Sequence, residues 1–126
     1  MIVDSSALVA ILFAEPDAAA FARVLMNEEH VRISAATVLE TALVVSPDLS
    51  SELDDLIARL GLQVTPFDAE HLAAARAAME TYGKGRGSRA QLNYGDCMSY
   101  ALAKVSGEPL LFKGDDFTHT DIAAAL

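Results

Sequence analysis

The chain has 126 residues, of which 52% are hydrophobic, and this size and composition predict one well-packed globular domain spanning residues 1–126. Its longest apolar run is far shorter than the roughly 18 residues that span a bilayer, and its single cysteine excludes an internal disulfide framework, so we expect a cytoplasmic protein without a membrane segment. Eighteen acidic and nine basic residues give a net charge of −9, which disfavours a general phosphate-backbone binder and favours a basic partner, a bound cation, or both.

Short apolar strands alternate with helical segments along the chain. Strands are expected at residues 1–3, 31–34, 62–67 and 109–112. Helices are expected at 7–15 after a cap at Ser5 or Ser6, at 16–29 from Pro16, at 35–45 after Ser34, at 51–60 between Ser50 and Gly61, at 69–82 after Asp68, and around Asp96 up to Gly107. No hairpin signal joins the strands. The pattern therefore predicts a three-layer α/β sandwich, in which helices flank a central parallel sheet.

Five acidic side chains stand at positions that this fold would bring to one edge of the sheet. Asp4 ends the first strand, Asp115 and Asp116 follow the fourth, and Asp96 opens the helix that leads into the fourth. Parallel sheets bind ligands beyond the carboxyl ends of their strands. Glu40 lies about one and a half turns into its helix among apolar neighbours, where an unpaired buried charge would be costly. We expect these carboxylates to converge.

Carboxylates within about 5 Å of each other repel, and their pKa values rise unless a positive charge lies among them. A hard divalent cation such as Mg²⁺ prefers oxygen ligands and usually keeps several waters. Such an ion can activate water and offset the charge that develops on a phosphodiester during in-line attack. The three histidines are scattered and do not have the spacing of a zinc site. The acids therefore predict metal-assisted phosphodiester hydrolysis.

Each acid also has a purely structural interpretation. Asn93 could cap the helix, which would make Asp96 a third helical residue that favours the helix dipole. Asp4 could cap the helix that follows it, and the pair Asp115 and Asp116 is an ordinary turn composition. Cys97 has no basic neighbour in the sequence, so we expect a small buried residue rather than a nucleophile.

Four segments of the chain resemble the PIN-domain ribonucleases and, more narrowly, the VapC-type toxins of bacterial type II toxin–antitoxin pairs. They are MIVDSSALVAILFAEPD, ISAATVLE, LNYGDCMSYALAK and GEPLLFKGDDFTHTDI, which occur in this order and involve essentially the whole chain. The resemblance implies a Mg²⁺- or Mn²⁺-dependent endoribonuclease whose sheet has four or five parallel strands. It also implies a homodimer and inhibition by a cognate VapB-type antitoxin.

By position, Asp4 and Asp96 match the two principal metal-binding aspartates of the family, and Glu40 matches the acid of the second segment. The GDD turn supplies the fourth acid, as either Asp115 or Asp116, because other branches carry their last acid where this chain has Gly114. Many members have threonine after the first aspartate, where this chain keeps a hydroxyl in Ser5.

Basic side chains suggest where RNA would approach. Lys84, Arg86 and Arg89 fall in one glycine-rich stretch beside the helix of Asp96, and Lys113 lies near the predicted cleft. We expect these four residues to contact RNA phosphates; a merely solvated loop is the alternative.

An antitoxin rich in arginine or lysine would be attracted to the acidic cleft. The first two helices carry more large apolar side chains than one core face requires: Leu8, Leu12, Phe13, Phe21 and Leu25. An apolar segment of the antitoxin could lie along these helices. The alternative is that these side chains simply pack on the sheet.

Two other function classes share features with this sequence. A phospho-acceptor receiver domain needs an acidic pair after its first strand, but here the pair follows the fourth, and only Asp68 follows the third. A PIN-like protein that has lost catalysis and acts only as a binding partner is the other alternative; the full set of acids argues against it.

Overall fold

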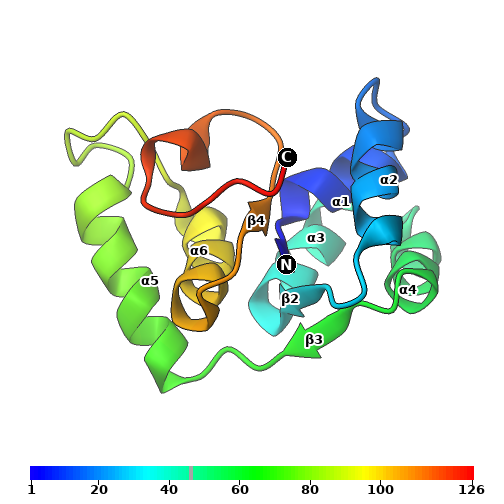
Figure 1. Cartoon of the computed structure of the whole chain (residues 1–126), viewed down its shortest axis with the longest axis horizontal. Helices are drawn as coiled ribbons and strands as arrows, with labels where there is room; N and C mark the ends of the chain where they lie inside the picture. Colours follow the sequence, from blue (N-terminus) through cyan, green and yellow to red (C-terminus); the bar gives the residue numbers. More distant parts are fainter. Residues whose placement is uncertain (46) are drawn as a thin grey trace.

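The computed structural model describes residues 1–45 and 47–126, and its centre is a parallel four-stranded sheet (Figure 1). The strand order is β3-β2-β1-β4, with bounds β1 Ile2–Val3, β2 Arg32–Ser34, β3 Gln63–Thr65 and β4 Leu110–Leu111. In β1, Ile2 pairs with Arg32 on one side and with Leu110 on the other. The predicted parallel sheet is confirmed.

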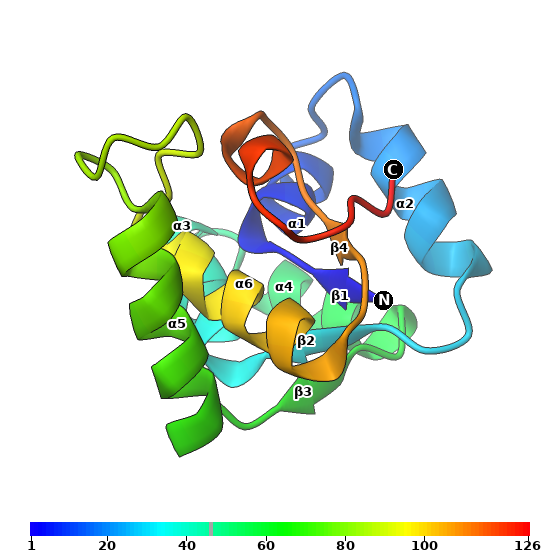
Figure 2. The ribbon, with the colours of Figure 1, turned by 60° about the vertical axis from the view of Figure 1, so that its left-hand side comes forward.

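Six α-helices and one 3₁₀-helix surround this sheet in the described part of the chain. Their bounds are α1 Ser5–Leu12, α2 Ala18–Asn27, α3 Ala35–Val45, α4 Ser50–Arg59, α5 Ala69–Tyr82, α6 Tyr94–Ser106 and η1 Asp116–His119. Figures 1 and 2 show α5 and α6 on one side of the sheet and α2 and α4 on the other. The α/β sandwich predicted from the alternation of strands and helices is therefore confirmed.

β1 and β4 are apolar and fully buried because both faces of the sheet are covered there, whereas the edge strand β3 is largely exposed. Successive residues of a strand point to opposite faces, and β1 and β4 follow this rule. Ile2 and Leu110 pack into the core shared with α5 and α6, whereas Val3 and Leu111 pack into the core shared with α1, α2 and α4. Two hydrophobic cores thus pack against the two faces of the sheet, and they fix the carboxyl ends of β1 and β4.

Most of the large side chains that we considered for antitoxin binding belong to the core. Leu8, Phe21 and Leu25 are buried against the sheet, so the alternative of core packing holds for these three. Leu12 is half-buried, and Phe13 is 49% exposed.

Some helix ends differ from the prediction. Of the caps that the sequence left open for α1, Asp4 is the one formed rather than Ser5 or Ser6, because its Oδ2 accepts the backbone N–H of Ser6 at 3.0 Å. A carboxylate at the end of a strand is a stronger acceptor than the hydroxyls that follow it. The second helix begins at Ala18 instead of Pro16, and α4 includes Ser50 as its first residue.

The predicted ends of α6 are confirmed. Asn93 and Asp96 form a reciprocal capping box, in which each side chain accepts the backbone N–H of the other at 2.8 and 2.9 Å. Gly107 ends the helix with a φ of 67°, a left-handed conformation that suits glycine.

The C-terminal segment covers the outer edge of β4. Leu110 donates its backbone N–H to Ala123 and accepts one from Ala125, both at 2.9 Å, in a parallel pairing. Asp121 anchors this segment to α6 by accepting from the Tyr100 hydroxyl at 2.7 Å and from the Lys104 ammonium at 2.5 Å. The β4 edge of the sheet is thereby covered. None of the helices in residues 1–45 and 47–126 is long and apolar enough to cross a membrane.

Candidate active site

Four acidic side chains lie near the carboxyl ends of β1 and β4. Asp4 follows β1 and is buried, Asp96 is in the first turn of α6, and Asp116 opens η1, the next element after β4. Glu40 reaches them from the middle of α3. In Figure 1 this region is the upper end of the sheet, where the chain leaves β4 for η1.

The electrostatics of Asp96 show that these carboxylates share one environment. Burial raises the pKa of Asp96 to about 7, against a smaller lowering by the hydrogen bond from the Asn93 backbone. The negative charges of Asp4, Asp116 and Glu40 contribute smaller parts of the same rise, and the value of about 7 includes them. Asp116, rather than Asp115, is the member of the GDD turn whose charge acts on Asp96.

Asp4 is held by hydroxyl groups at both of its oxygens. The Ser6 hydroxyl donates to Oδ2 at 2.6 Å, and the Ser99 hydroxyl of α6 donates to Oδ1 at 2.6 Å. Ser6 Oγ in turn accepts the backbone N–H of Lys113 at 3.0 Å, which ties the end of β4 to α1. Asp4 therefore caps its helix and belongs to the acidic cluster at the same time.

Glu40 is oriented by two residues from different helices. Its Oε1 accepts a hydrogen bond from the Ser5 hydroxyl. Its pKa is raised mainly by burial, which the Ser5 hydrogen bond opposes and the charge of Asp4 reinforces. Gly95 leaves the space that the carboxylate occupies, since a β-carbon there would lie 1.1 Å from Glu40 Oε2. A side chain at position 95 would push Glu40 away.

Cys97 is buried next to the cluster, as expected. Burial, followed by the charge of Asp96, raises the pKa of its thiol to about 11. A neutral thiol is a poor nucleophile at neutral pH, so Cys97 is a packing residue.

The donor set suits a hard cation that is bound partly through water. All four side chains offer carboxylate oxygen, and a cation would stabilise the charged form of Asp96, whose pKa is raised first by burial and then by the charges of Asp4, Asp116 and Glu40. Within residues 1–45 and 47–126, no three acidic, histidine or cysteine side chains are arranged to ligate one ion directly. Mg²⁺ usually takes only one or two protein carboxylates and keeps waters as its other ligands, which fits this spacing.

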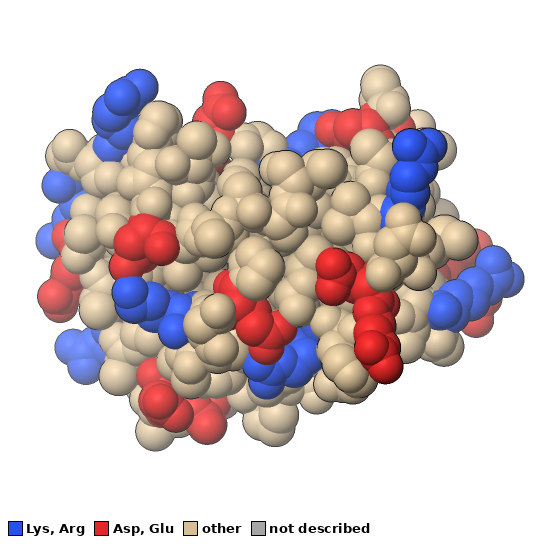
Figure 3. Space-filling view, in the orientation of Figure 1, with Lys and Arg blue, Asp and Glu red and all other residues tan. Residues whose placement is uncertain are grey.

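The basic side chains fall into two groups. Lys84, Arg86 and Arg89 are exposed on the loop between α5 and α6, where Lys and Arg atoms appear at the upper left of Figure 3. This loop is closed at its base by backbone hydrogen bonds from Lys84 to Leu92 and from Leu92 to Tyr82, at 2.9 and 2.8 Å.

Lys113 differs from the other three. Its ammonium pairs with Glu15 and with Asp17, the latter at 3.1 Å, at the junction of α1 and α2. The side chain that we expected beside the acids therefore points to these two carboxylates.

Several residues that shape the cluster were missed by the sequence analysis. Ser6, Ser99 and Thr37 supply buried or half-buried hydroxyls below the acids, and Gly95 supplies space. The spacing of Ser99, three residues after Asp96 and therefore on the same face of the helix, was the one available signal.

Comparison with known proteins identifies the family of the chain. The PIN domain family model matches residues 1–123. Ribonuclease VapC30 of Mycobacterium tuberculosis is 52% identical to this chain over 128 residues, which cover 98% of the chain and 96% of that protein.

Two solved structures share the fold. The crystal structure of Mycobacterium tuberculosis VapC20, described as a sarcin-ricin loop cleaving toxin, matches with a TM-score of 0.75 and 16% identity over 97% of this chain and 95% of that one. A toxin–antitoxin complex from Klebsiella pneumoniae matches with a TM-score of 0.73 and 14% identity over 99% and 97% of the two chains. From the family match and the identity to its curated relative, the chain belongs to the PIN-domain family, among the VapC ribonucleases.

Proposed function

We propose that this protein is a Mg²⁺-dependent endoribonuclease that acts as the toxin of a type II toxin–antitoxin pair in the cytoplasm. The observation that carries the proposal is the convergence of Asp4, Glu40, Asp96 and Asp116 at the end of a parallel sheet. The identity to a relative named as a ribonuclease supports RNA as the substrate.

The four acids have distinct places in this proposal. Asp4 and Asp96 are the principal ligands of the cation, and Glu40 and Asp116 act on it through bound waters; Asp115 is the alternative fourth acid. A bound Mg²⁺, or Mn²⁺ in its place, supplies an activated water and offsets the charge on the phosphodiester. Ser5 and Ser6 keep the carboxylates of Glu40 and Asp4 in place through hydrogen bonds to their oxygens.

RNA reaches the acids alongside the loop between α5 and α6. In this proposal, the exposed cations of Lys84, Arg86 and Arg89 bind the phosphate backbone and bring an anionic substrate to a protein with a net charge of −9. Lys113 contributes less, because Glu15 and Asp17 already neutralise its ammonium.

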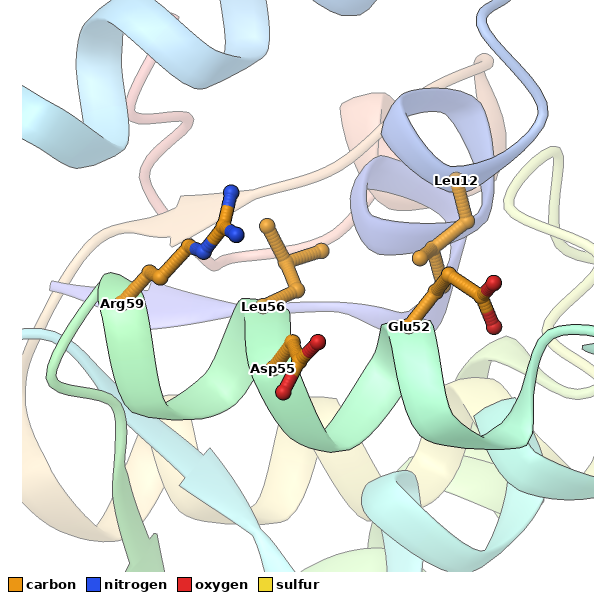
Figure 4. A pocket seen from close by; sticks show the side chains of 5 residues that line it. All are labelled: Leu12, Glu52, Asp55, Leu56 and Arg59. Atoms are coloured by element: carbon orange, nitrogen blue, oxygen red, sulfur yellow. The ribbon is translucent and has the colours of Figure 1, made fainter.

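A VapB-type antitoxin is the proposed inhibitor, and a groove between α1 and α4 offers it a surface. Figure 4 shows Leu12 of α1 next to Glu52, Asp55, Leu56 and Arg59 of α4, which together line this groove. Phe13, the residue that follows Leu12, is also exposed. An amphipathic segment with basic residues would pair its apolar face with the leucines and its cations with the acids.

A second copy of the chain is the proposed partner for an apolar surface formed by α3, α5 and α6. We call it the α3 face; its exposed members are Leu39, Leu43, Leu72 and Tyr94, which line two adjoining pockets that share Tyr94 and Met98. Leu43 is 73% exposed and Tyr94 is 77% exposed. Because contiguous exposed apolar side chains mark interaction sites, the α3 face supports the homodimer that the family resemblance implies.

RNA cleavage by the wild type and two variants tests this function. We expect a structured RNA to be cut in Mg²⁺ and left intact in EDTA. Asp4→Ala and Asp96→Ala should fold but lose cleavage, since each removes a ligand. If both variants cut RNA as fast as the wild type, the carboxylates are not the active site and the proposal fails.

A further inference from the structure

Two buried hydroxyls beneath the acidic cluster have no part in the function proposed above. Ser99 of α6 is 0% exposed and Thr37 of α3 is 1% exposed. Ser99 Oγ lies 2.6 Å from Asp4 Oδ1, and Thr37 Oγ1 lies 3.1 Å from Ser99 Oγ. Burying a hydroxyl without a hydrogen bond costs free energy, and these two hydroxyls avoid that cost by bonding to each other and to Asp4.

The hydroxyl protons determine which of the two residues donates in the hydrogen bond between Thr37 and Ser99. Ser99 has one hydroxyl proton, and the carboxylate of Asp4 can only accept it. The contact between Thr37 and Ser99 must therefore use the Thr37 proton. The result is a chain in which Thr37 donates to Ser99 and Ser99 donates to Asp4, so each bond polarises the next toward the anion.

The contact also connects three of the four elements that carry the acids. Thr37 lies three residues before Glu40 on α3, and Ser99 lies three residues after Asp96 on α6, so each hydroxyl is one turn away from an acid on the same helix face. The Ser99–Asp4 bond adds the start of α1. One junction therefore sets the spacing of Asp4, Glu40 and Asp96.

Packing alone does not require a hydroxyl at position 99. The buried residues that follow on α6 include Ala101 and Ala103, so an alanine side chain is well tolerated in this core. With Ser99, both oxygens of Asp4 are held, because Ser6 binds Oδ2 and Ser99 binds Oδ1. Without it, Oδ1 would be free to turn away from the cluster.

We propose that Ser99, supported by Thr37, is a positioning residue that fixes the Asp4 carboxylate and thereby determines the affinity of the site for its divalent cation. The inference rests on the proposed function. Partners that orient metal ligands commonly change metal affinity or activity by about 10–100-fold when they are removed.

The test measures Mn²⁺ binding to the RNA-free protein by electron paramagnetic resonance, together with the kcat and KM of RNA cleavage. Ser99→Ala should weaken Mn²⁺ binding and lower kcat by roughly tenfold or more, with little change in KM. Ser99→Cys restores most of the lost volume but offers only a weak S–H donor, so it should be impaired as well. Thr37→Val should show a smaller loss, and Ser99→Ala with Thr37→Val should be no worse than Ser99→Ala alone.

Thr41→Val is the matched control. Thr41 is also a buried α3 hydroxyl, but it donates to the Thr37 carbonyl at 2.8 Å rather than to the chain that ends on Asp4. This variant should bind Mn²⁺ and cleave RNA like the wild type.

Three results would count against the inference. Wild-type Mn²⁺ affinity in Ser99→Ala would overturn it, and so would full recovery in Ser99→Cys, because recovery would mean that volume rather than the hydrogen bond matters. If the wild type itself binds no Mn²⁺ and cleaves no RNA, the proposed function fails, and the inference fails with it.

Discussion

The carboxylate of Glu40 on α3 fills the space where a side chain of residue 95, at the start of α6, would lie. A β-carbon on Gly95 would be 1.1 Å from Glu40 Oε2. The carboxylate of α3 thus reaches the first turn of α6 only because residue 95 has no side chain. The obstructing atom is the end of a flexible side chain, so a larger residue at 95 would displace Glu40 rather than unfold the helix.

Gly95→Ala should therefore separate stability from activity. We expect its free energy of unfolding to stay within about 1 kcal/mol of the wild-type value, since alanine favours a helix over glycine by roughly this amount. RNA cleavage should fall to the level of Glu40→Ala, and the double variant should be no worse. Urea denaturation and cleavage rates measure the two effects; a Gly95→Ala protein with full activity would contradict the role of this contact.

The raised pKa of Asp96 predicts a pH-dependent stability in the absence of divalent cations. Its pKa is about 7 in the folded protein against an ordinary 3.8, so the folded state binds more protons than the unfolded state between these values. The free energy of unfolding should then fall as pH rises from about 4 to 7. Protonated Asp96 thus favours the folded state at low pH, and its ionisation opposes folding at high pH.

Asp96→Asn tests this assignment because an amide keeps the acceptor oxygen that caps α6. At pH 8 without divalent cations, the variant should be more stable than the wild type by on the order of 1 kcal/mol, after solvent screening is allowed for. At pH 5 the difference should shrink. Urea denaturation at both pH values gives the comparison, and an equal difference at the two would show that another group titrates.

The loop between α5 and α6 should affect substrate binding rather than chemistry. Replacing Lys84, Arg86 and Arg89 by alanine should raise KM for RNA, leave kcat near the wild-type value, and reduce the dependence of binding on salt. Arg23→Ala removes an exposed cation from α2, away from this loop, and is the control. Unchanged binding and salt dependence in the triple variant would mean that RNA approaches elsewhere.

A charge placed on the α3 face should disrupt a homodimer. Leu43→Glu is expected to halve the molar mass measured by light scattering, because it buries a carboxylate between two copies of the chain. Met26→Glu alters a residue of similar exposure, 74%, on α2 and should leave the mass unchanged. A dimer that survives Leu43→Glu would have to use another surface.

Local features of the chain were predictable because neighbouring residues determine them. Apolar strands that alternate with helices indicated the sandwich, and the capping box of Asn93 and Asp96 and the left-handed end at Gly107 follow from short-range hydrogen bonding and backbone sterics. The placement of acids directly after strands was also readable, since parallel strands end at one edge of a sheet.

The tertiary structure alone decided which side chains meet. Ser99 bonds to Asp4 across 95 positions, and the Lys113 ammonium turns to Glu15 and Asp17 instead of the acids. Leu8 in α1 and Phe13 at its C-cap are both hydrophobic, yet Leu8 is buried and Phe13 is exposed, so hydrophobic character alone did not distinguish them. Periodicity assigns a residue to a face of its own helix, but the neighbour that this face meets depends on how separate elements pack, and no short stretch of sequence contains that information.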